Sequence, residues 1–120
     1  PALERGAVVI SDRFFDSTLA YQGAARQFDL TLVETMCLFA TGDLVPDCTL
    51  FLDIDPMEGL KRARNVEELD RMESEAIGFH EAVRDGFLAI AEKQPKRLHR
   101  VDASLSPDEV FAQAVACLQN

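Results

Sequence analysis

Three short runs of consecutive apolar residues, each ending near an aspartate, alternate with longer segments in which apolar residues recur every three or four positions. Continuous apolar runs are typical of strands buried on both faces, whereas spacings of three and four are typical of helices packed on one side. Strands that alternate with helices pair in parallel through crossover connections. The pattern therefore predicts an α/β fold with a parallel sheet, whose strands are residues 7–10, 49–53 and 98–102.

Five helices are predicted between and after these strands. Two of their starts carry a capping residue, then a proline, then a glutamate three residues after the cap, at Asp55–Glu58 and Ser106–Glu109. The expected helices lie near residues 17–26, 29–41, 56–65, 73–93 and 107–118. Their clearest buried stripes are Leu30, Val33, Cys37 and Ala40 in one helix, and Ala76, Phe79, Val83, Phe87 and Ile90 in another. No repeat or linker divides the chain, so residues 1–120 are predicted to form one domain.

Composition narrows the classes of protein to consider. A net charge of −9 repels polyanions, so we expect no nucleic-acid binding. No apolar run approaches the length that spans a bilayer, and the first residues lack the order of a signal peptide, so we expect a cytoplasmic protein without a membrane partner. Cys37, Cys48 and Cys117 are widely spaced in apolar surroundings, which indicates reduced, buried thiols.

The segment after the first predicted strand carries the strongest candidate chemistry. A charged pair at the carboxyl end of a strand, Asp12 and Arg13, precedes a helix start rich in hydroxyl groups, as where open α/β folds bind phosphorylated ligands. The Arg13 guanidinium can hold a phosphate through two parallel hydrogen bonds, and Asp12 can accept hydrogen bonds from water on Mg²⁺. The alternatives are a surface Arg13 paired with Asp16, and Asp12 as a strand-end cap.

Polar side chains on the next helix are spaced to converge beside this pair. Hydroxyls and an aromatic ring next to an arginine suit a nucleoside monophosphate. Alternatively, the serine is a helix cap and the tyrosine a half-buried core ring. The converging residues are Ser17, Thr18, Tyr21 and Gln22.

A second basic cluster could serve an anionic ligand or a solvated helix end. Its members, Lys61, Arg62, Arg64 and Arg71, lie within eleven residues. An arginine delivered by a mobile segment can neutralise the transition state of phosphoryl transfer. The alternative is a set of exposed ion pairs worth about 0.3–0.5 kcal/mol each.

The run from Asp12 to Gly23, DRFFDSTLAYQG, resembles the Asp-Arg and Ala-Tyr-Gln-Gly block of bacterial thymidylate kinases, and Leu69-Asp70-Arg71 resembles the exit of their lid. The resemblance implies the parallel-sheet nucleoside monophosphate kinase fold, related to P-loop NTPases. The phosphate-loop motif G-x-x-x-x-G-K-[ST] does not occur in the chain. Residues 1–120 are therefore interpreted as a partial thymidylate kinase domain, the carboxyl-terminal portion of the fold.

This resemblance also implies an activity: transfer of the γ-phosphate of ATP to dTMP, giving dTDP for dTTP biosynthesis, with Mg²⁺, by an enzyme that is a homodimer at full length. It implies that Arg13 is catalytic. It also implies that Arg64 takes over the catalytic role of a basic lid residue that relatives commonly carry where this chain has Val66. The dTMP site would comprise Arg13, Ser17, Thr18, Tyr21 and Gln22. The ATP phosphates would contact the lid residues Arg62, Arg64 and Arg71. The metal would contact Asp12 and Glu73, directly or through water.

Three further expectations follow. His80 is interpreted as structural, because transfer between phosphates needs charge neutralisation more than a base. Without a phosphate loop, the isolated chain should lack kinase activity. Two other functions stay open: another deoxynucleotide or nucleoside kinase of the same fold, and a non-catalytic fragment that binds a nucleotide or a partner chain.

Overall fold

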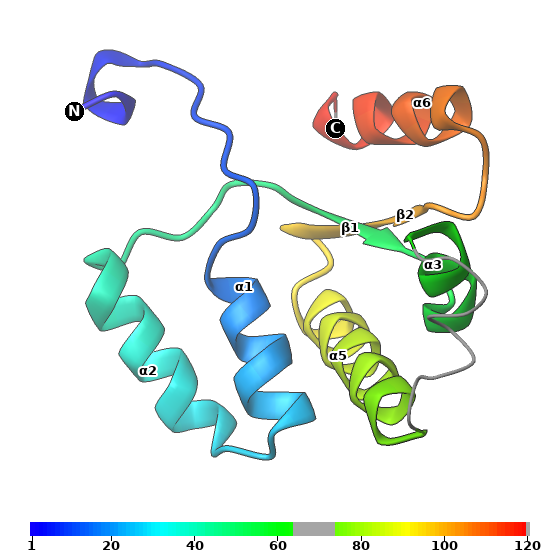
Figure 1. Cartoon of the computed structure of the whole chain (residues 1–120). Helices are drawn as coiled ribbons and strands as arrows, with labels where there is room; N and C mark the ends of the chain where they lie inside the picture. The colour runs from blue at the N-terminus through cyan, green and yellow to red at the C-terminus, as the bar shows by residue number, and fades with distance from the viewer. Residues whose placement is uncertain (64–73, 120) are drawn as a thin grey trace.

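The computed structural model describes residues 1–63 and 74–119, in which two parallel strands are surrounded by helices (Figure 1). A helix that begins at Phe15 as α1 continues without a break into the wider turns of the π-helix η2. No described helix has both the length and the apolar character of a membrane span. In chain order the elements are η1 (Leu3–Arg5), α1 (Phe15–Thr18), η2 (Leu19–Ala25), α2 (Leu30–Thr41), β1 (Thr49–Asp53), α3 (Pro56–Ala63), α5 (Ser74–Lys93), β2 (Leu98–Asp102) and α6 (Pro107–Leu118).

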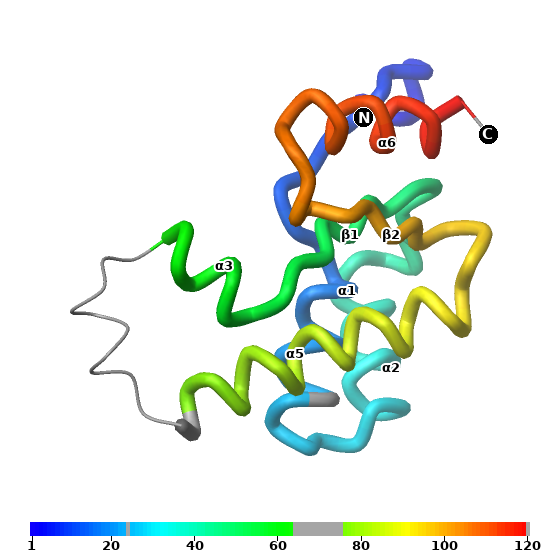
Figure 2. The backbone as a smooth tube through the Cα atoms, turned by 90° about the vertical axis from the view of Figure 1, so that its right-hand side faces the viewer, coloured from blue at the N-terminus to red at the C-terminus, as the bar shows by residue number. Residues whose placement is uncertain are grey.

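The sheet is the middle layer of the molecule. Strands β1 and β2 pair in parallel, with Thr49 opposite Leu98 and Asp53 opposite Asp102. Helix α6 covers one side of the strands, and α5 covers the other (Figure 2). Val101 of β2 is fully buried between these layers, as expected for a strand covered on both faces. The predicted α/β class and these two strands are confirmed.

The first of the three predicted strands, residues 7–10, is wrong for this structure. Residues 7–10 form no strand, and the side chains of Val8 and Ile10 are 90% and 92% exposed. A strand needs a neighbouring chain that supplies backbone hydrogen bonds, and no described segment lies in the sheet beside this one. The apolar run is therefore suited to pair as a strand, but none of the described residues pairs with it.

Local capping explains where the helices begin. The Asp55 carboxylate accepts hydrogen bonds from the backbone N–H groups of Met57 and Glu58, and Ser106 and Glu109 form a reciprocal capping box. Both predicted starts are confirmed. The predicted ends of the third helix at residue 65 and the start of the fourth at residue 73 lie outside the described residues.

A small core joins α1, η2 and α2. Phe15, Leu19 and Cys37 are buried together, and Val33 packs against them. The other two members of the predicted α2 stripe, Leu30 (46% exposed) and Ala40, are exposed, so the stripe is buried only in part. The three thiols are free, but of these only Cys37 is buried, so the prediction of buried thiols holds for Cys37 alone. Burial raises the pKa of the Cys37 thiol, which keeps it protonated at neutral pH.

A buried ion pair fastens this helical layer to the sheet. The Asp16 carboxylate, 2% exposed, accepts two hydrogen bonds of 2.7 Å from the Arg97 guanidinium, which lies just before β2. The Thr49 hydroxyl at the start of β1 donates to the same carboxylate at 3.1 Å. Gln94 accepts from Arg97 Nε at 2.7 Å. Three separate parts of the chain thus meet at one carboxylate, which fixes the first turn of α1.

Candidate functional site

Arg13 stands at the entrance to α1 in an unusual backbone conformation. Its φ of +67° is left-handed, a region that non-glycine residues occupy at a cost of about 1–3 kcal/mol and that is frequent at functional sites. The Ser11 hydroxyl donates to the Arg13 carbonyl oxygen at 2.9 Å, which holds this turn.

The Arg13 side chain is held by its neighbours on the helix. Its Nε donates to the Ser17 hydroxyl at 3.2 Å, and its Cζ lies 4.6 Å from the centroid of the Tyr21 ring. No described carboxylate forms an ion pair with it, and Asp16 is taken by Arg97, so the alternative of an Arg13–Asp16 pair is wrong. The guanidinium is therefore oriented by a hydroxyl and a ring, with its terminal nitrogens available to an anion.

All five predicted dTMP-binding residues line one hollow of about 340 Å³, which we call the polar hollow. Thr18 is exposed on its rim, and Ser17 and Tyr21 are half-buried. A guanidinium, hydroxyls and an amide converge there within two helical turns, which matches the donors and acceptors of a phosphorylated nucleoside. The lining residues are Arg13, Phe14, Ser17, Thr18, Tyr21 and Gln22.

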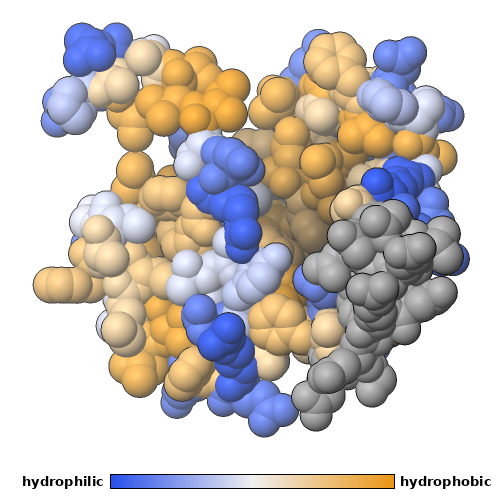
Figure 3. All heavy atoms as spheres, viewed as in Figure 1, coloured by the Kyte–Doolittle hydropathy of each residue, from blue (hydrophilic) through white to orange (hydrophobic). Residues whose placement is uncertain are grey.

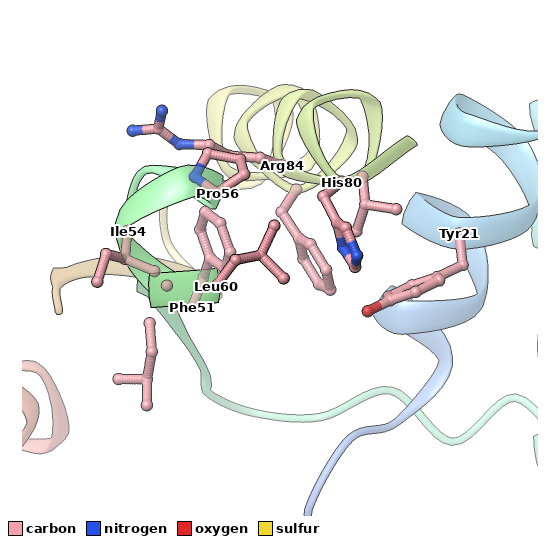
Figure 4. A pocket seen from close by; sticks show the side chains of 11 residues that line it. Tyr21, Phe51, Ile54, Pro56, Leu60, His80 and Arg84 are labelled. Carbon is pink, nitrogen blue, oxygen red and sulfur yellow. The ribbon is translucent and has the colours of Figure 1, made fainter. Parts of the chain in front are cut away.

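A second hollow of about 260 Å³, the apolar hollow, is lined mainly by residues of β1, α3 and α5 (Figure 4). Tyr21 and His80 line one end of it, whereas the Arg84 guanidinium points away. Tyr21 is the one side chain shared by the two hollows. The orientation of this ring therefore affects the shape of both. The remaining lining residues are Phe51, Leu52, Ile54, Pro56, Gly59, Leu60, Val83 and Phe87.

The Tyr21 ring is packed against α5. It meets the Phe79 ring edge to face, with centroids 5.9 Å apart and planes at 64°. Arg26 lies over the face of Phe79, with its Cζ 5.9 Å from the centroid. A Cβ at Gly23 would come within 2.1 Å of the end of the Leu30 side chain, so a larger residue there would displace that side chain where η2 approaches α2.

Asp12 is exposed beside Arg13. Among the described residues no group of three or more potential metal ligands is found, so a directly coordinated metal would have to take most of its ligands elsewhere. A single exposed carboxylate fits contact with Mg²⁺ through water, because Mg²⁺ keeps several waters in its coordination shell. The second predicted metal residue, Glu73, lies outside the described residues.

Arg62 makes defined contacts with the turn after β2. Its NH1 donates to the Ala103 carbonyl at 2.8 Å, and its NH2 donates to the Ser104 carbonyl at 2.9 Å. It also pairs with Glu58, one helical turn earlier. Arg62 therefore joins the end of α3 to the β2–α6 turn. The other predicted lid residues, Arg64 and Arg71, lie outside the described residues.

A second buried carboxylate, that of Asp53, lies at the carboxyl end of β1. Asp53 accepts from Arg84 Nε at 2.7 Å and from Arg100 Nε at 2.6 Å. Burial alone would raise the pKa of Asp53, but the hydrogen bonds from the two arginines outweigh it and hold this pKa below its ordinary value. Asp53 is therefore ionised and neutralised at physiological pH.

Sequence reasoning missed two residues that support the polar hollow. Arg97 was assigned no role, and Phe79 was one member of an apolar stripe. Nothing local signals that Arg97 pairs with Asp16, 81 residues earlier. The stripe containing Phe79 was a usable signal, because it placed the ring on the packed face of α5.

Comparison with known proteins agrees with this geometry. The chain aligns with the crystal structure of thymidylate kinase from Ehrlichia chaffeensis at a TM-score of 0.70 and 33% identity, over 99% of this chain and 53% of that one. It is 50% identical over 111 residues to a thymidylate kinase of Carboxydothermus hydrogenoformans, covering 92% of this chain and 54% of the relative. A thymidylate kinase of Protochlamydia amoebophila is 41% identical, covering 99% and 56%.

The parallel strands, their helical layers and this structural match define an α/β protein of the nucleoside monophosphate kinase fold. The sequence profile of thymidylate kinase matches residues 1–114, and the chain belongs to the thymidylate kinase family. The chain spans about half the length of the relatives it matches.

Proposed function

We propose that this segment forms the dTMP-binding part of a thymidylate kinase that transfers the γ-phosphate of ATP to dTMP. The observation that carries the proposal is the arrangement of Arg13. Its guanidinium lines the polar hollow, is oriented by Ser17 and Tyr21, and has no described carboxylate as a partner. Membership of the thymidylate kinase family supports dTMP as the phosphate-bearing ligand.

In the proposed mechanism the residues of the hollow bind and orient the acceptor. Arg13 Nε is occupied by Ser17, so the two terminal nitrogens are left to hold the dTMP phosphate. An oxygen of that phosphate attacks the γ-phosphorus of ATP, the bond from this phosphorus to the bridging oxygen breaks, and ADP leaves. Thr18 and Gln22 would contact the base, and Tyr21 would crowd the position of a ribose 2′-hydroxyl.

Charge on the reacting phosphates is proposed to be neutralised by Mg²⁺ and by lid arginines. Asp12 would contact the hydrated ion through water, and Glu73 would assist it. When bound, Mg²⁺ would offset negative charge on the ATP phosphates. Arg64 would approach the transferred phosphoryl group, with Arg71 nearby. Arg62 would act at the base of this segment, where its bonds to Ala103 and Ser104 support a positioning role near ATP.

We propose that the 120 residues alone do not transfer phosphate, because their sequence contains no phosphate-loop motif to cradle the ATP phosphates. A further segment of the enzyme would supply it. The complete enzyme is proposed to be a cytoplasmic homodimer that binds neither nucleic acid nor membrane.

A chimaeric enzyme tests the proposal. The part of the Carboxydothermus hydrogenoformans relative that precedes its matched segment would be joined to Pro1 of this chain. ADP formation with dTMP, ATP and Mg²⁺ is then measured. Arg13→Ala should lower kcat/KM for dTMP by about 30- to 1,000-fold, equivalent to about 2–4 kcal/mol. Arg13→Lys should restore little, because an ammonium group cannot form the paired hydrogen bonds.

Arg5→Ala, at an exposed arginine in η1, is the matched control and should leave turnover unchanged. Tyr21→Ala should narrow the preference for dTMP over its ribose counterpart. An active chimaera in which Arg13→Ala behaves like Arg5→Ala would show that Arg13 does not hold the acceptor phosphate. An inactive chimaera without dTMP binding would argue against the kinase assignment.

A further inference from the structure

The polar hollow depends on a ring whose orientation is set from a distant part of the sequence. No described residue hydrogen-bonds the Tyr21 hydroxyl, so the ring is oriented by the groups that touch its faces and edges. Two of those groups are the Arg13 guanidinium, 4.6 Å from the ring centroid, and the Phe79 ring, whose centroid is 5.9 Å away. Arg13 is exposed and adjustable, whereas Phe79 is half-buried on a long packed helix.

Phe79 has the support that a fixed contact needs. It lies one helical turn before Val83, which is buried against the rest of the protein, so its direction is set by the packed face of α5. Helices α5 and η2 pack closely against each other, and the Phe79 and Tyr21 rings meet in this contact. The Arg26 guanidinium lies over the Phe79 face, which adds a second constraint on that ring.

The contacts form a continuous series: Arg26, Phe79, Tyr21 and Arg13, with the last guanidinium also held by Ser17. Phe79 itself lines neither hollow. Its contribution to the polar hollow must therefore pass through Tyr21.

We propose that Phe79 is a positioning residue for acceptor recognition: it holds the Tyr21 ring at the angle that excludes a ribose 2′-hydroxyl and supports Arg13 under the acceptor phosphate. This inference rests on the proposed function. Edge-to-face packing of two rings contributes enough to account for about a 2- to 10-fold change in acceptor affinity.

The test is a double-mutant cycle in the chimaeric enzyme. Phe79→Ala should raise KM for dTMP about 2- to 10-fold and leave KM for ATP within 2-fold. It should also narrow the preference for dTMP over its ribose counterpart, as Tyr21→Ala does. In the Tyr21→Ala background, Phe79→Ala should have no further effect on either quantity, because two residues that act through one contact are not additive.

Two more variants separate positioning from general stability. Phe79→Leu keeps apolar volume without a ring and should behave like Phe79→Ala, whereas Phe79→Tyr keeps the ring and should restore KM for dTMP. Phe111→Ala is the matched control, because Phe111 is 70% exposed on α6 on the far side of the sheet. Equal losses for dTMP and ATP, or full additivity with Tyr21→Ala, would overturn the inference while leaving the kinase assignment intact. A parent chimaera that is inactive and does not bind dTMP would overturn both.

Discussion

Replacing Arg97 by methionine should destabilise the fold by about 3–5 kcal/mol, because the change leaves a buried carboxylate without its cation. The Asp16 side chain is 2% exposed and would lose both of its 2.7 Å hydrogen bonds to Arg97. It would keep the 3.1 Å bond from the Thr49 hydroxyl. One neutral hydrogen bond contributes about 0.5–1.5 kcal/mol, too little to offset the desolvation of a charge.

Equilibrium unfolding of the chimaeric enzyme in urea, followed by circular dichroism, measures this loss. Arg100→Met is the matched control: Arg100 also pairs with a buried carboxylate, but it is exposed itself, and Asp53 keeps Arg84. The control should cost about 1 kcal/mol or less. The double variant Asp16→Leu/Arg97→Met should recover most of the stability, because apolar side chains can replace a buried ion pair at little cost. A loss in Arg97→Met no larger than in Arg100→Met would refute this account.

Three other predictions concern different parts of the molecule. In the chimaera, Arg64→Ala should lower kcat much more than it weakens dTMP binding, because a lid contact forms only on closure. Equal, small effects of Arg64→Ala and Arg62→Ala on kcat would contradict this prediction. The pKa of Asp53 lies below its ordinary value of 3.8, so the stability that its ionised form contributes is complete above about pH 4 and is lost as the pH falls further. Asp53→Asn should therefore weaken the dependence of the free energy of unfolding on pH in that acid range, as measured by urea unfolding. The isolated chain should self-associate and unfold with low cooperativity, because Val8 and Ile10 are exposed and a two-stranded sheet is marginal; a monomer in sedimentation with a sharp thermal transition would exclude this.

The surface agrees with the last of these expectations. Hydrophobic atoms gather on the amino-terminal segment and on α6, with a recess between them (Figure 3). Leu52 of β1 and Phe111 of α6 are among the exposed apolar residues. Contiguous exposed apolar surface of this kind favours association.

Local patterns predicted most of the fold because the information that sets a helix is local. Apolar spacing and caps such as Ser106 with Glu109 lie within a few residues of the elements they define. Strand pairing depends on a partner elsewhere in the chain, so the run at residues 7–10 was predicted to be a strand although no described segment pairs with it. The register of β1 on β2 was likewise invisible before the structure.

In the candidate site, too, local contacts could be predicted from the sequence and long-range contacts could not. Ser17 and Tyr21 were grouped correctly because a separation of four along a helix brings side chains to one face. Arg13, which precedes the helix, contacts both of them. Asp16 was misassigned to Arg13 as a possible partner, because sequence proximity hides a competitor 81 residues away. The long-range pair of Asp16 with Arg97 leaves Arg13 without a described carboxylate partner and so available to a ligand.

This selection explains how a chain with a net charge of −9 can present a site for an anion. The net charge of these 120 residues repels an anion at long range, so anion binding must depend on the local field at the site. The buried carboxylates are neutralised by their own arginines, Asp16 by Arg97 and Asp53 by two others, whereas Arg13 has no described acidic partner. Asp12, the exposed carboxylate beside it, is the group proposed to face hydrated Mg²⁺. The arrangement therefore leaves positive charge where a phosphate is proposed to bind and places the remaining negative charge where a cation can offset it.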